Sequence, residues 1–276
     1  QALSGVGFRT VSGDGGRIEP ADVEQAMTMA GFFPRIGLMV WENTHNMSGG
    51  RVIPIDLMEK TSQVARAHGL RIHVDGARIF NAVVASGVPA DRYAAVGDTI
   101  QFCFSKGLGA PVGSVLLGSR DFLKEARSVA LRIGGGMRQA GIVAAGGLYA
   151  LKHHVGRLEE DHANARRLAA ELDGIPTVEV INAPVATNIV VFRWKTPSMG
   201  LPAFRERIAG SGMLLDDRGF PLFRAVIHMG IGKREISRVA RALREIFAGG
   251  ERRPPTMAGD TPQRAGRGRS STCDLI

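Results

Sequence analysis

The sequence predicts an α/β protein with a mostly parallel sheet, flanking helices and a smaller C-terminal α+β domain. Three largely apolar runs, 36–41, 70–75 and 98–104, alternate with segments of helical periodicity. This alternation is typical of a parallel sheet with helices on both faces, because each parallel crossover needs a connecting segment. After about residue 154 the order changes to a long helix, several strands and a closing helix, which indicates a second domain.

The first half of the chain supplies the elements of the larger domain. Residues 8–11 are a short strand candidate, and Pro20 is placed to begin a helix that runs to residue 30. The run 36–41 is continuously apolar, as expected of a strand buried on both faces. Pro54 begins the next helix and Gly69 ends it. The remaining expected elements are strands at 70–75, 98–104 and 113–117 and helices at 77–86 and 121–132.

The second half has a different pattern and then a change of composition. Expected helices cover 139–151, 154–172, 201–209 and 233–247, and expected strands cover 178–181, 188–194, 213–215 and 225–228. From residue 249 the chain is rich in Pro, Gly, Arg, Ser and Thr, which predicts a disordered tail. We therefore divide the chain into a large domain over 1–154, a small domain over 155–248 and a basic tail over 249–276.

The net charge of +9 raises the question of nucleic-acid binding. The charges are spread over amphipathic helices rather than gathered in one run, and only two Trp and two Tyr are available for base stacking. Solvated helix faces and clefts that attract anions explain the charge better, so we do not expect a nucleic-acid partner.

The sequence also favours a cytoplasmic protein. No apolar run is long enough to cross a bilayer, and the first residues do not resemble a signal peptide. Cys103 and Cys273 are not expected to pair, which is consistent with a reducing compartment. No group of Cys and His has the spacing of a zinc site, so we expect no metal.

An acid and a lysine follow two of the expected strands. Asp75 ends the run 70–75, and Lys106 comes shortly after the run 98–104. Ligands in open α/β sheets collect at the carboxyl ends of strands. Pyridoxal phosphate needs such a pair, because a desolvated lysine can hold its aldehyde as an imine and a carboxylate keeps its ring nitrogen protonated. The simpler interpretations are a lysine that points to solvent and an aspartate that caps the helix after it.

Four stretches of the chain together resemble the L-threonine aldolases, which are fold-type I pyridoxal-phosphate enzymes. The similarity runs from about the first residue to about Phe247, and the stretches follow the order of that family. They are residues 42–46, 73–84, 105–114 and 134–139. The resemblance implies that residues 1–154 form the cofactor-binding domain and that its N-terminal part is missing. That missing part would hold the family's phosphate-binding loop and the aromatic residue that stacks on the cofactor.

The resemblance assigns roles to several residues. Lys106 is expected to be the Schiff-base lysine, and Asp75 the partner of the pyridine nitrogen. Arg78 is expected to grip the substrate α-carboxylate with two parallel hydrogen bonds, and Arg224 is a second candidate for the same carboxylate. Arg138 occupies a position that in the family's oligomers reaches a neighbouring subunit's cofactor; simple packing is the alternative.

His45 is a candidate for the base that takes the hydroxyl proton, although a histidine in such a place can instead only orient its loop. The family often has another histidine near the position of Phe32. Its absence here would loosen the preference between threonine and allo-threonine.

The activity that the resemblance implies is the retro-aldol cleavage of L-threonine or L-allo-threonine to glycine and acetaldehyde, in a homodimer or homotetramer. Two other interpretations stay open. One is another fold-type I enzyme, a β-eliminating lyase or an aminotransferase, which would share the Asp–Lys pair. The other is a non-catalytic basic binding protein on a decayed enzyme fold.

Overall fold

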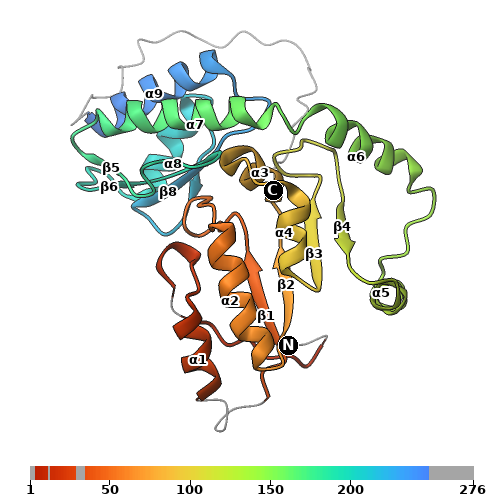
Figure 1. Ribbon diagram of the computed structural model, residues 1–276. Coiled ribbons are helices and arrows are strands. Elements are labelled where there is room, and N and C mark those ends of the chain that lie inside the picture. Colours follow the sequence, from red (N-terminus) through yellow and green to blue (C-terminus); the bar gives the residue numbers. More distant parts are fainter. Residues whose placement is uncertain (1–3, 12, 29–34, 249–276) are drawn as a thin grey trace, which may run out of the picture.

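A parallel sheet forms the core of the N-terminal part of the chain. The computed structural model describes residues 4–11, 13–28 and 35–248 (Figure 1). The first sheet has the order β1 (Leu38–Glu42), β2 (Arg71–Asp75), β3 (Thr99–Cys103) and β4 (Ser114–Leu117). The pairs β1–β2 and β2–β3 are parallel, whereas β4 is antiparallel to β3. The predicted mostly parallel α/β architecture is therefore confirmed.

One face of this sheet is covered by helices. They are α1 (Pro20–Thr28), α2 (Ile55–Ala67), α3 (Ile79–Ser86) and the short α4 (Ala90–Val96), which was not anticipated. The side chains of Trp41, Ile72 and Val74 are fully buried on this face. They belong to one core with Met58 of α2 and Tyr93 of α4. Ahead of α1, a short 3₁₀ helix, η1 (Asp14–Gly16), stands where a turn was expected.

The other face of β1 is open to solvent in the part of the chain that the structure describes. Leu38 and Val40 are 51% and 42% exposed, whereas Met39 and Trp41 between them are buried. The prediction that this strand is buried on both faces is therefore wrong for the described residues, because α2 packs against only every second side chain. Residues 8–11 do not form a strand.

The C-terminal part has a sheet of its own, with the order β5-β6-β8-β7 and only antiparallel pairs. Helices α7 and α9 pack against each other beside it, around an aromatic core that includes Phe192, Trp194 and Phe223. Between the two sheets the chain forms α5 (Arg120–Arg132) and α6 (Gly141–His153). The C-terminal part consists of α7 (Leu158–Asp173), β5 (Val178–Val180), β6 (Ile189–Trp194), α8 (Leu201–Gly210), β7 (Asp216–Asp217), β8 (Leu222–Val226) and α9 (Lys233–Ala248).

Two details of this second sheet differ from expectation. Residues 213–215 do not form the predicted strand and instead precede the two-residue β7. The strand expected at 225–228 lies earlier, at Leu222–Val226. The domain boundaries remain our prediction, and the tail over 249–276 lies outside the described residues.

The loop that contains Gly49 and Gly50 docks on the part of the chain that forms the second sheet. Asn182 donates a hydrogen bond to the carbonyl oxygen of Gly49 at 2.8 Å, and the Thr187 hydroxyl donates to that of Gly50 at 2.7 Å. Both glycines have positive φ angles, and a Cβ on Gly49 would lie 2.3 Å from Asn182 Nδ2. Only glycine permits this conformation at such close approach, so these two residues let the loop dock on the second sheet.

His162 of α7 is buried at the junction between the two parts. Its side chain is fully inaccessible, and its Nε2 lies 3.0 Å from Nδ2 of Asn81 on α3. The pKa of His162 is lowered to about 4, chiefly by burial; Glu159 opposes the shift and Arg166 adds to it. The imidazole is therefore neutral in the folded protein at neutral pH.

The stability of the fold should fall on acidification because of His162. Between pH 6.5 and about 4, the unfolded chain binds a proton at this residue that the folded chain does not. The free energy of unfolding should therefore drop by about 1.4 kcal/mol per pH unit over this window, about 3 kcal/mol in all. Denaturant unfolding at several pH values measures the slope. His162→Gln should flatten it, and an equal slope in this variant would contradict the assignment.

Candidate active site

Asp75 lies at the carboxyl edge of the first sheet, in one row with Glu42 of β1 and Gln101 of β3. Its Oδ1 accepts hydrogen bonds from the backbone N–H of Ala77, at 3.0 Å, and from the Gln101 side chain. The bond to Ala77 shows that Asp75 also stabilises the start of the following helical segment. Among the described residues Oδ2 accepts no hydrogen bond, so one carboxylate oxygen is oriented and available.

Lys106 lies at the same edge, three residues after the end of β3. The structure thus brings the lysine and the acid to the ends of two neighbouring parallel strands. The lysine is exposed and its amine makes no hydrogen bond or ion pair with the described residues. The expectation of a desolvated lysine is therefore wrong for this part of the chain, because no described segment covers the Lys106 side chain, although Gly107 and Leu108 beside it are buried.

Arg78 is the N-cap residue of α3, and its side chain is half-buried at the same edge. Burial lowers the pKa of the Arg78 guanidinium; Glu42, Cys103 and Asp75 oppose the shift, and Arg218 adds to it. None of these groups forms an ion pair with Arg78 within the described residues. A partly desolvated guanidinium without a direct partner can bind a carboxylate through two parallel hydrogen bonds.

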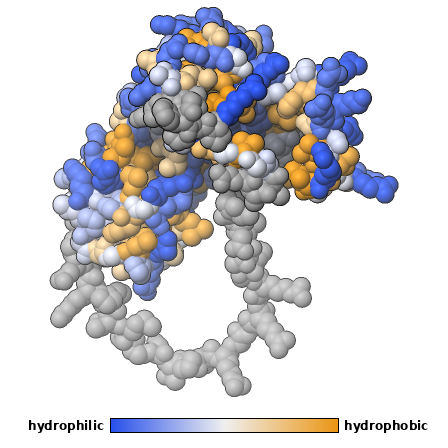
Figure 2. Space-filling model, turned by 90° about the horizontal axis from the view of Figure 1, so that it is seen from below, coloured by the Kyte–Doolittle hydropathy of each residue, from blue (hydrophilic) through white to orange (hydrophobic). Residues whose placement is uncertain are grey.

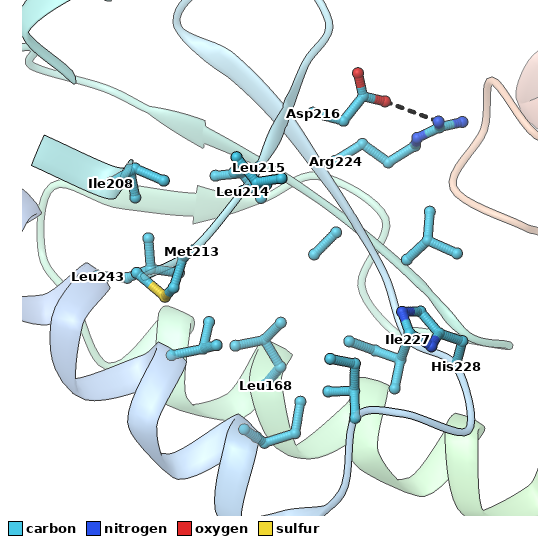
Figure 3. A pocket seen from close by; sticks show the side chains of 15 residues that line it. Leu168, Ile208, Met213, Leu214, Leu215, Asp216, Arg224, Ile227, His228 and Leu243 are labelled. Carbon is cyan, nitrogen blue, oxygen red and sulfur yellow. Dashed lines mark ion pairs between the residues drawn. The ribbon is translucent and has the colours of Figure 1, made fainter. Parts of the chain in front are cut away.

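Arg224 reaches the site from β8 of the second sheet. Its Nη1 donates to Oδ1 of Asn46 at 2.7 Å, and its Nη2 lies 2.7 Å from Oδ2 of Asp216 (Figure 3). Asp216 also lies 3.2 Å from Nε of Arg218. Arg224 thus already has an anionic neighbour, and a substrate carboxylate would share or displace it.

An apolar cavity of about 250 Å³ lies beside this ion pair. Figure 3 shows Asp216 and Arg224 at one side of it and the side chains of α7 and α9 at another. Its labelled apolar lining includes Leu168, Met213, Leu214, Ile227 and Leu243.

His45 and Arg138 have different surroundings. Nδ1 of His45 lies 2.7 Å from the Ser48 hydroxyl, and Nε2 lies 3.8 Å from Oε2 of Glu42. His45 therefore lies in the loop that also presents Asn46 to Arg224. Arg138 is exposed between α5 and α6, and no hydrogen bond or ion pair links it to the described residues. The structure does not bring it to the other five candidates within this chain.

Sequence reasoning missed the groups that hold these candidates in place. Gln101 bonds Asp75, Glu42 accepts from the backbone N–H of Asn46 at 3.0 Å, and Asp216 pairs with Arg224. For Gln101 a signal existed: it is a polar residue between apolar Ile100 and Phe102, which places it on the same sheet face as Asp75. For Asp216 no local signal existed, because its partner lies on another strand.

Comparison with known proteins decides the family. The model of the beta-eliminating lyase family matches residues 1–195. A probable low-specificity L-threonine aldolase of Arabidopsis thaliana is 39% identical over 251 residues, which is 89% of this chain and 71% of that protein. The chain belongs to the L-threonine aldolase branch of the beta-eliminating lyase family. This confirms the resemblance that the four sequence stretches indicated.

The family relatives are longer than this chain. The low specificity L-threonine aldolase of Escherichia coli K12 is 37% identical over 237 residues, and the match covers 84% of this chain but 64% of that protein. A second Arabidopsis thaliana enzyme, low-specificity L-threonine aldolase 1, is matched over 55% of its length. The chain thus spans roughly half to two thirds of these two relatives.

Solved structures share the fold. A threonine aldolase of Leishmania major superposes with a TM-score of 0.71 at 18% identity, over 86% of this chain and 70% of that one. Oryza sativa TDC, solved with PLP and tryptamine, superposes with a TM-score of 0.62 at 18% identity, over 84% of this chain and 52% of that one. The chain therefore shares the fold of these two proteins.

The described residues contain no group of three or more His, Cys, Asp or Glu residues placed to hold a metal ion. None of their helices combines the length and the apolar character that crossing a membrane requires.

Gly76 is a position where an added side chain would be costly. It is buried directly after Asp75, its N–H donates to the Gln101 carbonyl oxygen at 2.8 Å, and an added Cβ would lie 2.8 Å from that same oxygen. Because a backbone atom cannot move aside cheaply, Gly76→Ala should lower the free energy of unfolding by about 1–3 kcal/mol.

The matched control is Gly37→Ala, since nothing lies within 4 Å of a Cβ at Gly37 and its φ is not positive. Denaturant unfolding of both variants checks the prediction. Equal losses in the two would show that the close approach at Gly76 is unimportant.

Proposed function

We propose that this aldolase-family protein cleaves L-threonine and L-allo-threonine to glycine and acetaldehyde with pyridoxal 5′-phosphate as cofactor. One observation carries the proposal: a carboxylate, an amine and a guanidinium lie at one edge of the first sheet, and the two cations have no ion-pair partner among the described residues. The three groups belong to Asp75, Lys106 and Arg78. Because the chain spans only part of its relatives, the activity of the whole protein is a proposal.

The residues at this edge fit the cofactor. Pyridoxal phosphate, when bound, supplies an electron sink for the bond that breaks at the substrate Cα. Lys106 would hold its aldehyde, since its amine has no hydrogen-bond or ion-pair partner among the described residues. Asp75 would keep its ring nitrogen protonated, with Oδ2 available and Oδ1 held by Gln101 and Ala77. Arg138 is proposed to serve a neighbouring subunit's site.

The substrate would be held by its carboxylate. Arg78 would bind it with two parallel hydrogen bonds, and Arg224, fixed by Asn46, would bind it from the second sheet. His45 would take the β-hydroxyl proton on Nε2, since Nδ1 is engaged by the Ser48 hydroxyl. By binding the carboxylate, the two arginines would orient the substrate and so determine which bond at Cα breaks. They would therefore control the type of reaction.

A second candidate reaction is β-elimination, which the description of the matching family favours. It would use the same lysine and acid but release 2-oxobutanoate and ammonia from threonine. The two reactions differ in whether the Cα–Cβ bond or the bond to the β-hydroxyl breaks.

We also propose that the protein is a homodimer or homotetramer that acts in the cytoplasm. Large apolar side chains of α5 and α6 are exposed, including Leu131 at 61%, Ile142 at 82% and Leu148 at 69%. Figure 2 shows hydrophobic groups among the hydrophilic surface on one face of the molecule. Such surface is typical of subunit interfaces.

The proposed role of Lys106 predicts a complete loss of function in Lys106→Ala. Without the amine, the visible absorbance of lysine-linked cofactor and the release of acetaldehyde should both disappear. Absorbance titration with pyridoxal phosphate and an aldehyde assay measure them. Lys152→Ala, on α6, is the control and should keep both. Unchanged turnover in Lys106→Ala would refute the assignment.

Product analysis with threonine separates the two reactions. The wild-type protein should release glycine and acetaldehyde in equal amounts. Release of 2-oxobutanoate and ammonia would instead support β-elimination. No cofactor absorbance together with salt-sensitive RNA binding would favour the non-catalytic alternative.

The two arginines should contribute to substrate binding. Arg78→Gln removes a charge-assisted double hydrogen bond, so KM for threonine should rise by about tenfold or more while cofactor absorbance persists. Arg71→Gln, on the exposed start of β2, is the control. Steady-state kinetics measure KM, and an unchanged KM in Arg78→Gln would show that the carboxylate binds elsewhere.

A further inference from the structure

Asn81 is a buried amide at the point where the segments of three candidate residues meet. It lies on α3, is 2% exposed, and its backbone N–H donates to the carbonyl oxygen of Arg78 at 2.9 Å. A buried amide is costly unless its donors and acceptor are used, so its contacts are informative.

The side chain of Asn81 contacts both parts of the molecule. Its Nδ2 lies 3.0 Å from Nε2 of His162 and donates to Oδ1 of Asn188 at 3.3 Å. Asn188 in turn donates to the Ile227 carbonyl oxygen and accepts from the Ile227 N–H, both at 2.8 Å. Ile227 follows β8, three residues after Arg224. The amide is thereby connected to the strand of the second arginine.

The oxygen of the same amide faces the lysine loop. A Cβ on Gly107 would lie 3.0 Å from Oδ1 of Asn81, so the backbone next to Lys106 packs directly on this group. The glycine leaves room for that approach. The Asn81 side chain therefore contacts Gly107, the residue after Lys106. Asn81 also lies in the first turn of the helix that Arg78 caps, and hydrogen bonds link it to the strand of Arg224.

The orientation of the network follows from its partners. The two N–H bonds of the Asn81 amide point at two acceptors, the Asn188 oxygen and Nε2 of His162. The proton of the neutral imidazole then lies on Nδ1, which is buried without a hydrogen-bond partner among the described residues. His162 thus serves Asn81 only as an acceptor.

We propose that Asn81 is a positioning residue that sets the arrangement of Arg78, Lys106 and Arg224 across the junction of the two sheets. The inference rests on the proposed function for its kinetic consequence. Its structural consequence is that α3, the lysine loop and β8 move together because one buried amide couples them.

The test compares identical substitutions at two buried amides. Asn81→Asp keeps the shape but replaces the donor to the Asn188 oxygen by an anionic oxygen, and Asn81→Leu removes all the side-chain hydrogen bonds. Asn164 is the control, because it is also 2% exposed and its amide donates to the Ile231 carbonyl oxygen at 3.1 Å and to no other group among the described residues. Asn164→Asp and Asn164→Leu should therefore disturb only the small domain.

Two measurements on the holoenzyme decide whether Asn81 positions the three candidate residues. Hydrogen–deuterium exchange should accelerate together in residues 79–86, 104–110 and 222–228 of the Asn81 variants, but not in 79–86 or 104–110 of the Asn164 variants. KM for threonine should rise and kcat/KM fall by about tenfold or more in the Asn81 variants only. His162→Gln, which keeps an acceptor, should preserve KM, whereas His162→Leu should raise it.

The outcomes separate the two proposals. If the wild-type protein releases no acetaldehyde, the proposed function fails, and the exchange pattern alone still tests Asn81. If the wild-type protein is active and the Asn81 variants keep its KM, or if exchange accelerates only in 79–86, the positioning role is wrong. Should Asn81→Asp fail to fold, Asn81→Leu and the two His162 variants give the same decision.

Discussion

The parallel register of β1, β2 and β3 is the constraint on which the candidate site depends. It sets Glu42, Asp75 and Gln101 side by side at the carboxyl edge, so that an amide orients the carboxylate and a second acid lies near Arg78. A slip of one residue would turn Asp75 toward the buried helical layer, where its charge would have no partner. The hydrophobic alternation of the strands therefore determines the chemistry at their ends.

The second sheet completes the site through a small number of polar contacts. The loop that follows β1 docks through Gly49 and Gly50 and presents Asn46 to Arg224. Without this docking, nothing would hold Arg224 of β8 beside the loop that follows β1. The site is thus a property of the junction between the sheets and not of either sheet alone.

The sequence predicted the parts of this arrangement that local pattern determines. Strand β2 and its terminal Asp75 followed from alternation, and the roles of Lys106, Arg78 and Arg224 came from similarity to a family. It did not predict the exposure of Lys106, because burial depends on which segments cover a loop. Nor did it predict Asn81 or Asp216, because their partners lie far away in the chain and their meaning comes only from tertiary contacts.

The open face of the first sheet has a thermodynamic consequence. Because side chains alternate along a strand, Leu38 and Val40 share their face with Glu42 and, through the register, with Asp75. Any polypeptide that covers those apolar residues also forms part of the wall around the acid. Covering the face and filling the space beside Asp75 are then coupled equilibria, in which each event changes the affinity of the other by the same factor.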